Sequence, residues 1–248
     1  CVFTWKQSQR NYQVATLGVA VVCFVASLLL GGPFSVRTIL PGTHKPLHLV
    51  EILGPHCEKY KKKYPMIDCD RHLAIDFSKW HYVARIDVLN PGLDPIGFGG
   101  GLGAAYPAKK LPGSFKMRSI LQDGSAPTYL LDVQSTKLSD HVWAEHILQS
   151  APYRIKKSPD VAIVGVGGGP DIVMALYNNA KSIIGVEINP VTASLLTNVF
   201  ADYSGRIAFD PRVKIINREG RNFFTLTQEK FDVVHLSGVD TFTASSSG

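Results

Sequence analysis

The stretch "VAIVGVGGGPDIVMALYNNAKSIIGVEINP", residues 161–190, decides the fold of this chain. A continuous apolar run leads into a turn of five residues, four of which are glycine, and after a helical run a second apolar run ends at Glu187. Buried strands joined by a helix are the unit from which parallel sheets are built. The stretch therefore predicts a strand, a tight turn, a helix and a second strand.

The chain after Pro190 repeats this alternation. A helical run opened by Pro190 is followed by a third strand, "RVKIINRE", a short helix, "RNFFTLTQ", and a fourth strand, "FDVVHLS", at residues 231–237. Short apolar strands separated by helices require parallel pairing, with helices on both faces of the sheet. We therefore predict an α/β fold with a doubly wound, Rossmann-like parallel sheet over residues 139–248.

The part before this sheet has a different pattern. Short strand-like runs, "HYVARIDVL", "RSILQDG" and "PTYLLDV", are separated by turn residues, and Asp123 with Gly124 gives a hairpin signal between the last two. Residues 36–138 are therefore predicted to form a linker and a small β-rich domain. The following segment, "SDHVWAEHILQSAPYRI", has helical spacing and is predicted to form a helix that Pro152 stops.

An uncharged segment lies near the start of the chain. Residues 14–30 contain no charge, with Lys6 and Arg10 before them and Arg37 and Lys45 after them. These 17 residues cover about 25 Å as a helix. The segment predicts a transmembrane helix over about residues 13–31, within a membrane segment 1–35, and a signal-peptide core and a buried helix remain as alternatives.

The composition excludes some partners. Lys and Arg outnumber Asp and Glu by six, and several of the lysines lie in "EKYKKKY", but no nucleic-acid module accompanies them. We read this run as a solvated or juxtamembrane face and predict no nucleic-acid partner. The four cysteines form no C-x-x-C pair, and no standard zinc spacing is present, so we predict no metal.

The glycine turn predicts a site for a nucleoside without phosphates. Pro170 stands where the dinucleotide pattern needs its last glycine, and neither a lysine in the loop nor a G-K-[ST] motif is present to hold a triphosphate. Glu187 ends the second strand, where a carboxylate can accept both ribose hydroxyls. Glu219 follows the third strand, where an acid can receive an adenine amino group. Asp171 opens the first helix and can receive an ammonium group or cap the helix.

Four motifs in order, "VAIVGVGGGPD", "IIGVEINP", "NREGRNFF" and "FDVVHLSGVD", resemble class I S-adenosylmethionine-dependent transferases, and most closely their spermidine synthase-like (aminopropyltransferase-like) branch. The resemblance implies the class I methyltransferase type of sheet, in the strand order 3-2-1-4 and truncated here after the fourth strand. It implies decarboxylated S-adenosylmethionine, or S-adenosylmethionine itself, as the donor substrate. The residues that it assigns to the donor are Gly165, Gly167, Gly168 and Gly169 of the turn, Asp171, Glu187 on the ribose, and Glu219 with Gly220 on adenine.

The segment after the fourth strand departs from the pattern of that branch. The polyamine synthases carry Asp-Ser-Ser-Asp there, whereas this chain has Ser237, Gly238, Val239 and Asp240. A cationic amine must lose a proton before it attacks, so Asp240 is the predicted catalytic base. Ser237 and Asp123 are weaker candidates for contacts with the substrate, and Tyr203 and His235 are weaker neighbours of the base. His235 is interpreted first as a packed core residue.

These observations support three hypotheses. The first is aminopropyl transfer to a small-molecule amine, in polyamine biosynthesis. The second is methyl transfer from S-adenosylmethionine, which the same nucleoside site would serve. The third is a membrane-anchored nucleoside-binding module without turnover, which the missing first aspartate favours.

The uncharged N-terminal segment adds a resemblance to membrane-attached bacterial proteins described as spermidine-synthase-like. It implies a protein of the bacterial inner membrane with its catalytic domain in the cytoplasm, and a homodimer is left open. Because the chain starts at Cys1 and ends soon after the fourth strand, we expect it to be a fragment.

Overall fold

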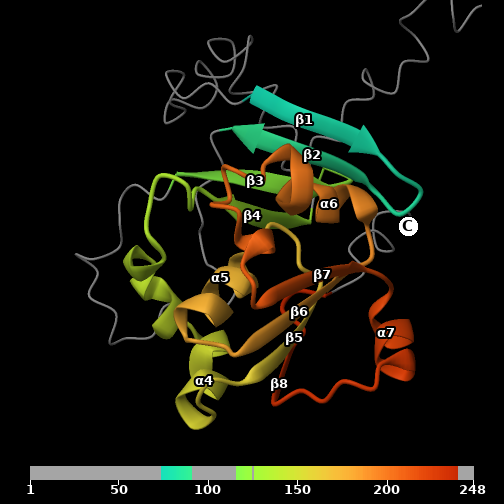
Figure 1. Ribbon diagram of the computed structural model, residues 1–248. Coiled ribbons are helices and arrows are strands. Elements are labelled where there is room, and N and C mark those ends of the chain that lie inside the picture. Colours follow the sequence, from blue (N-terminus) through green and yellow to red (C-terminus); the bar gives the residue numbers. More distant parts are fainter. Residues whose placement is uncertain (1–73, 91–115, 125, 240–248) are drawn as a thin grey trace, which may run out of the picture. The chain divides into compact units, whose positions relative to one another are not determined.

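The computed structural model describes residues 74–90, 116–124 and 126–239 (Figure 1). All of them lie in one unit of the chain, which runs from Thr43 to Gly248. Within this unit an antiparallel sheet precedes a parallel α/β sheet, as the change of sequence pattern predicts.

The antiparallel sheet has four strands in chain order, β1 (Ala74–Trp80), β2 (Arg85–Asn90), β3 (Met117–Gln122) and β4 (Pro127–Leu131). β2, β3 and β4 confirm the predicted strands, whereas β1 was not predicted. Asp123 and Gly124 lie in the connection from β3 to β4, residues 123–126, and their φ angles of 49° and 72° are in the left-handed region that this residue pair favours.

The parallel sheet consists of β5 (Asp160–Val164), β6 (Ser182–Glu187), β7 (Val213–Asn217) and β8 (Val233–His235). Their order in space is β7-β6-β5-β8, and every described pairing among them is parallel. This arrangement confirms the predicted Rossmann-like order. Because parallel strands end at the same edge, the residues that follow β5, β6, β7 and β8 are brought to one side of the sheet.

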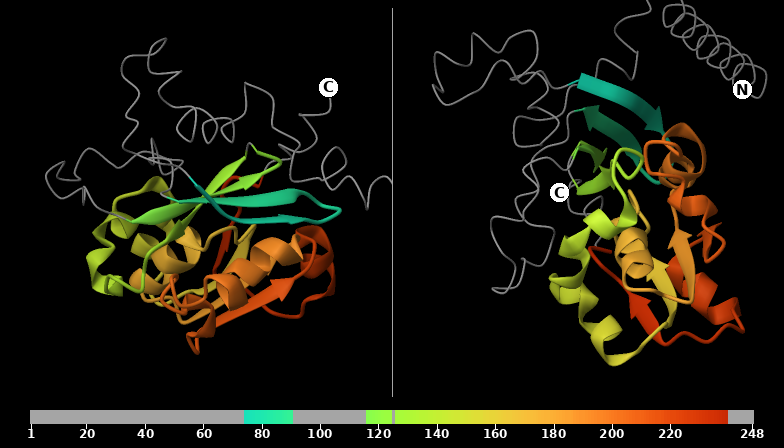
Figure 2. Two further views of the ribbon diagram at one scale, coloured as in Figure 1. Left: turned by 90° about the horizontal axis from the view of Figure 1, so that it is seen from above. Right: turned by 60° about the vertical axis from the view of Figure 1, so that its left-hand side comes forward.

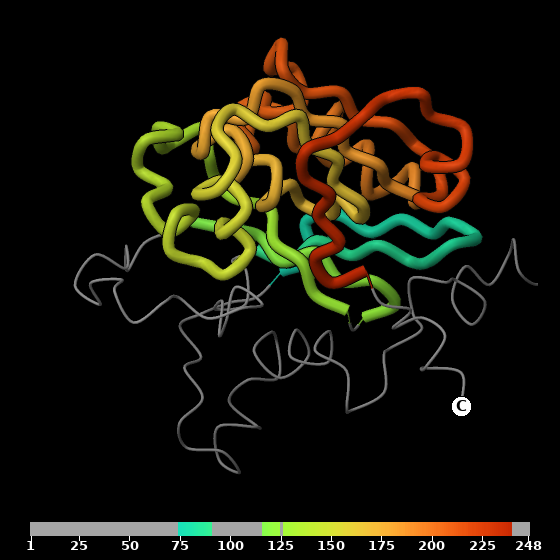
Figure 3. Tube along the Cα trace, turned by 90° about the horizontal axis from the view of Figure 1, so that it is seen from below, coloured from blue at the N-terminus to red at the C-terminus, as the bar shows by residue number. Residues whose placement is uncertain are grey.

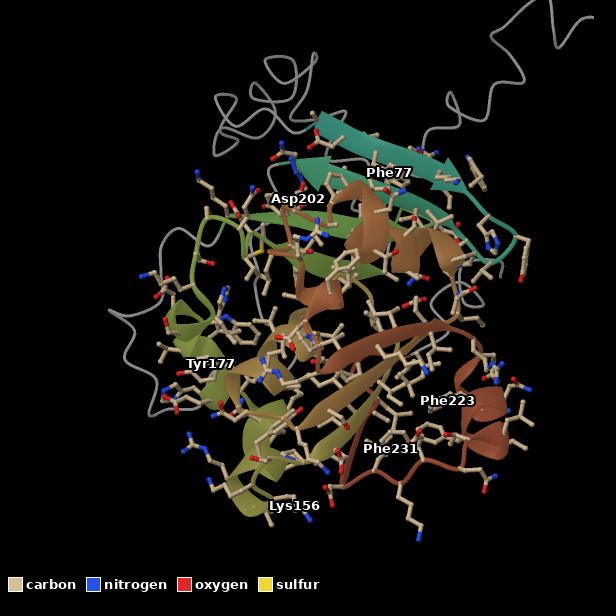
Figure 4. All side chains as sticks on the ribbon, viewed as in Figure 1. Phe77, Lys156, Tyr177, Asp202, Phe223 and Phe231 are labelled. Carbon is tan, nitrogen blue, oxygen red and sulfur yellow. The ribbon has the colours of Figure 1, made fainter. Side chains whose placement is uncertain are left out.

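Helices connect these strands. The α-helices are α4 (Ala151–Ile155), α5 (Pro170–Tyr177), α6 (Pro190–Ser194) and α7 (Gly220–Leu226), and a π-helical turn, η6 (Leu195–Val199), extends α6. A short 3-10 turn, η7 (Ile207–Phe209), precedes β7. Phe223 of α7 is buried and points toward Phe231, with ring centroids 6.1 Å apart (Figure 4).

The single helix predicted over "SDHVWAEHILQSAPYRI" is wrong. The segment forms three 3-10 turns, η3 (Leu138–Asp140), η4 (Val142–Glu145) and η5 (Leu148–Ser150), and Pro152 lies in the first turn of α4 instead of ending a helix. Proline has no N–H to donate and its ring crowds the preceding turn, so it is accepted only where a helix begins.

The antiparallel sheet packs against the parallel unit (Figure 2). Phe77 of β1 meets Phe200 edge to face at 6.3 Å. The Arg118 guanidinium of β3 lies over the rings of Phe200 and Tyr203, at 4.9 and 4.5 Å, and pairs with Asp76 at 3.0 Å. These contacts join β1 and β3 to the segment that follows η6.

The predicted localisation in the bacterial inner membrane is corrected. Across the described ranges, the structure contains no helix of the length and apolar character that a membrane span requires. The longest α-helix among these residues, α5, has 8 residues, about 12 Å, whereas a hydrocarbon core is about 30 Å thick. The predicted helix at about 13–31 itself lies outside the described residues.

Candidate active site

The glycine turn connects β5 to α5 in a backbone conformation that L side chains rarely adopt. Gly165, Gly167 and Gly169 have φ angles of 76°, 54° and 84°. At Gly167 a Cβ atom would also lie 2.9 Å from Oγ1 of Thr128 in β4. The turn therefore needs glycine at this position both for its backbone angle and for the close approach of the hairpin.

Gly168 has a different reason to be glycine. Its φ angle is not in the left-handed region, but a Cβ atom there would overlap the carbonyl group of Tyr129. The backbone of β4 thus lies directly against the turn. Gly168 was predicted to face the donor, and the structure gives it a packing role against the antiparallel sheet.

Glu187 is tied to the glycine turn. Its Oε2 accepts a hydrogen bond from the amide of Gly167 at 3.1 Å, and its Oε1 accepts one from the amide of Asn189 at 2.9 Å. Burial raises the pKa of Glu187, and the backbone amides of Asn189, Gly167 and Ile188 oppose this effect without cancelling it. A carboxylate offers about four acceptor positions, so it retains capacity for a further hydroxyl donor.

The residues after Glu187 are fixed by further hydrogen bonds. The Asn189 side chain caps α6 by accepting from the amide of Val191 at 2.9 Å. Asn217 lies at the end of β7. Its side-chain Nδ2 donates to the backbone carbonyl oxygens of Glu187 at 2.7 Å and Ile188 at 3.1 Å. The carboxylate is therefore held by a rigid loop that two neighbouring strands share.

Glu219 caps α7. Its two carboxylate oxygens accept from the amides of Arg221 at 3.0 Å and Asn222 at 2.7 Å, and these bonds lower its pKa. Gly220 brings the start of α7 against β5, because a Cβ atom there would lie 2.8 Å from Val164. Glu219 and Gly220 thus follow β7 at the same edge as Glu187, as predicted.

Asp171 and Ser237 meet at the start of α5. His235 and the Ser237 hydroxyl both act to lower the pKa of the Asp171 carboxyl group. Burial is the largest influence and raises the pKa of Asp171. The segment after β8 is the red end of the tube in Figure 3. Within it, Cγ1 of Val239 lies 3.2 Å from the position that a Cβ atom at Gly165 would take.

The remaining predicted residues have other surroundings. Asp123 accepts from the amide of Arg85 at 2.9 Å, which is a structural role in the hairpin, so its substrate contact stays a prediction. Asp240, the predicted base, lies outside the described residues. Tyr203 packs on Arg118, and burial raises its pKa to about 12.

The sequence did not point to Tyr153. Its hydroxyl lies 3.0 Å from Nε2 of His235, and the two rings stack at 5.6 Å. His235 is buried as expected, but in a polar contact and not among apolar groups alone. The residues are 82 apart, so only the fold reveals the pair.

A parallel sheet whose glycine turn meets a carboxylate at the end of the next strand is typical of Rossmann-like domains that bind nucleotides and nucleosides. No protein-family model matches the chain. Among curated proteins, the chain is similar to polyamine aminopropyltransferases. That of Buchnera aphidicola subsp. Schizaphis graminum is 28% identical over 109 residues, which cover 44% of this chain and 38% of the relative.

Two further relatives have the same description. The polyamine aminopropyltransferase of Yersinia pestis (strain Pestoides F) is 30% identical over 106 residues, 41% of this chain and 35% of the relative. Polyamine aminopropyltransferase 1 of Hyperthermus butylicus is 24% identical over 171 residues, 64% of this chain and 56% of the relative. The matched part thus spans 35–56% of these relatives' lengths. These relatives confirm the resemblance to the spermidine synthase-like branch. They do not confirm that the protein is attached to a membrane or that the chain is a fragment.

Two solved structures are similar. A spermidine synthase in complex with the transition state analogue AdoDATO has 18% identity and a TM-score of 0.41, over 64% of this chain and 46% of that chain. A spermidine synthase from Thermotoga maritima has 16% identity and a TM-score of 0.44, over 68% of this chain and 48% of that chain.

Proposed function

We propose that this chain carries the donor site of an aminopropyltransferase of polyamine biosynthesis. The donor is decarboxylated S-adenosylmethionine, and the acceptor is a small-molecule amine. In this proposal residues 36–138 form the β-rich domain beside the site, and residues 139–248 form the domain that binds the donor.

The observation that carries the proposal is the contact between Gly167 and Glu187. The amide of Gly167 donates to the carboxylate of Glu187, which joins the turn to the end of β6, and the packing of β4 requires glycine at positions 167 and 168. Ribose hydroxyls are donors that a carboxylate accepts well, and Glu187 retains acceptor capacity for such a donor. The described turn, residues 165–169, contains no lysine or arginine that would favour a phosphorylated ligand.

The two ends of the donor then have separate partners. Glu219 and Gly220, after β7, are assigned to adenine, and the glycines of the turn to the ribose and the methionine-derived part. Asp171 is assigned to the ammonium group at the far end of the donor, because it is a partly buried carboxylate at the start of α5, directly after the same turn. The curated relatives, whose name states aminopropyl transfer, support an aminopropyl donor.

The reaction is a displacement at carbon. The nitrogen of the acceptor amine attacks the methylene carbon bonded to the sulfonium, the C–S bond breaks, and its electron pair stays on sulfur as a neutral thioether. The nitrogen loses one proton, for which Asp240 is the proposed base. The protein contributes proximity and a site of low polarity, in which loss of the sulfonium charge is favourable.

The test is to measure binding and transfer with the 248-residue chain. Calorimetry with 5′-methylthioadenosine and with decarboxylated S-adenosylmethionine reports the donor site, and labelled decarboxylated donor with a panel of amines, putrescine among them, reports transfer. Transfer from S-adenosylmethionine alone would replace the proposal by methyl transfer. Absence of binding by both nucleosides would refute the donor site.

A further inference from the structure

A buried histidine, His141, lies between two hydrogen bonds in the segment that connects β4 to α4. It is 0% exposed and stands directly before η4. Nε1 of Trp143, a residue that is 1% exposed, donates to its Nδ1 at 3.2 Å. On the other side of the ring, its Nε2 lies 3.0 Å from Oγ1 of Thr136. None of these three residues takes part in the reaction proposed above.

The donors in this chain of hydrogen bonds follow from the chemistry of the side chains. An indole nitrogen only donates, so Nδ1 of His141 is the acceptor and carries no proton. The proton of the neutral ring is then on Nε2, where it points to Oγ1 of Thr136. The Thr136 hydroxyl donates its own proton to the backbone carbonyl oxygen of Asp132 at 3.0 Å. Every proton of the chain is therefore placed, and His141 is the neutral Nε2–H form.

Protonation of His141 is incompatible with this arrangement. The second ring proton would be on Nδ1, where it would face the N–H of Trp143 across 3.2 Å, so that two donors would meet without an acceptor. The imidazolium would also be buried beside Trp143, which belongs to the hydrophobic core. A buried charge is costly unless it is paired. The ring can therefore take up a proton only if the contact with Trp143 opens.

The negative charge of Asp140 acts on the ring but does not reverse the effect of burial. Asp140 is exposed, and its carboxylate accepts from the amide of Lys137 at 2.9 Å. Burial lowers the pKa of His141, and Asp140 opposes this without cancelling it, so the ring is neutral near pH 7. The other acidic and basic side chains of this segment, of the residue after β4 and of α5, which packs on η3 and η4, are Asp132, Lys137, Glu145, His146 and Asp171.

We propose that Thr136, His141 and Trp143 form an acid-sensitive switch, which holds the segment after β4 in place at neutral pH and releases it when the imidazole takes up a proton. Thr136 connects the ring to Asp132, the residue that follows β4. The backbone carbonyl of Tyr129 in β4 lies directly against Gly168. Opening of the switch therefore acts on the strand that packs on the glycine turn. This inference does not depend on the proposed function.

The switch gives the stability of the chain a defined dependence on pH. Because the pKa of His141 is lowered in the folded state, the unfolded chain binds this proton more tightly. The stability that the neutral ring contributes is present above the ordinary pKa of 6.5 and is lost as the pH falls towards the folded value. Below about pH 6.5, the folding equilibrium constant is expected to fall by up to about tenfold per pH unit from this group.

NMR of the wild-type 248-residue chain tests the switch without any substitution. At about pH 8, nitrogen-15 spectra are expected to show a protonated Nε2 and an unprotonated Nδ1 in His141. On acidification, the indole N–H resonance of Trp143 and the amide resonance of Gly168 are expected to change with the same midpoint as the ring. A protonated Nδ1 at this pH, or titration of the ring at its ordinary pKa, would overturn the inference. So would a ring that titrates while the Trp143 and Gly168 resonances stay unchanged.

His141→Asn and His146→Gln form a matched pair for unfolding in urea. The Oδ1 atom of asparagine takes the place of Nδ1 as acceptor for Trp143 but does not titrate. His141→Asn is therefore expected to be less stable than the wild type near pH 8 and to lack the additional fall in stability below about pH 6.5. His146→Gln removes a partly exposed imidazole from the same segment and is expected to keep this fall. An equal fall in His141→Asn and in the wild type would overturn the inference, and if His141→Asn does not fold, the titration of the wild-type ring decides.

Discussion

The amide of Gly167 lies 3.1 Å from Oε2 of Glu187, a residue 20 positions further along the chain. This bond joins the turn after β5 to the end of β6, so the conformation of the glycine turn and the position of the carboxylate depend on each other. A ligand that contacts the glycine turn therefore depends on the position of Glu187, and a ligand that contacts Glu187 depends on the conformation of the turn.

Replacement of Glu187 by glutamine tests this coupling. A glutamine side chain has only one acceptor oxygen, so one of the amides of Gly167 and Asn189 would face an NH₂ group. We expect a loss of about 1–3 kcal/mol in the free energy of unfolding, measured in urea, and about tenfold weaker binding of 5′-methylthioadenosine. Unchanged stability and affinity would show that the coupling has no energetic consequence.

The stability deficit of Glu187→Gln is also expected to depend on pH. Because the pKa of Glu187 is raised in the folded state, the folded state binds its proton more tightly than the unfolded chain does. This contribution to stability is complete below the ordinary pKa of about 4.5 and is lost as the pH rises through the folded value. Glu187→Gln lacks this loss, so its deficit relative to wild type is expected to be larger at low pH than near neutrality.

Gly168→Ala tests the packing of β4 on the turn. The new methyl group would meet the carbonyl of Tyr129, which is backbone and cannot rotate away, and we expect a loss of about 3 kcal/mol in unfolding free energy. The control is Gly238→Ala, where φ is 64° and nothing lies within 4 Å, so only backbone strain of about 1 kcal/mol is expected. Equal losses in the two variants would mean that the hairpin is not in contact with the turn.

The sequence predicted the parallel sheet because its signals are local. Most of these strands are short apolar runs, such as β5 and β6, that alternate with helical runs, and the order of pairing follows from the handed connections of such units. Glu187 could be found for the same reason, since a strand of known length places its last residue at the edge of the sheet. The helix caps at Asn189 and Glu219 also lie where the chain changes direction.

The rest depends on contacts between distant segments. The strand β1 was missed because Ala74–Trp80 is mostly exposed on both faces and has no clear apolar alternation. His235 has the position of a core residue, and its partner Tyr153 follows a proline that was read as a stop. The reason for Gly168 is a backbone carbonyl on another sheet, which no pattern within the turn encodes.

Glu219→Asn tests the assignment to adenine apart from the helix cap. Asparagine is a good cap residue, so stability is expected to change by less than about 0.5 kcal/mol in urea unfolding. If the carboxylate receives the adenine amino group, 5′-methylthioadenosine should bind about tenfold more weakly. The 6-oxo analogue, 5′-methylthioinosine, is the control ligand and should be little affected. An equal change for both ligands would assign Glu219 to the cap alone.

Ser237→Ala tests the hydrogen bond to Asp171. The serine hydroxyl lowers the pKa of Asp171 against the effect of burial, so its loss should raise that pKa further and remove an interaction that favours the carboxylate. We expect a loss of about 1–3 kcal/mol in unfolding free energy near neutral pH, which shrinks as the pH falls and Asp171 takes up a proton. A group whose pKa is raised in the folded state stabilises the fold at low pH and loses this effect as the pH rises. Because Ser237→Ala raises the pKa of Asp171 further, the variant loses more stability than the wild type as the pH rises.

The control for Ser237→Ala is the same substitution in an Asp171→Asn background. An amide does not titrate, so the effect of losing the hydroxyl should then be independent of pH. A deficit of Ser237→Ala that is constant over the whole range in the Asp171 background would show that the serine acts through packing, because only a charged partner can make the loss depend on pH.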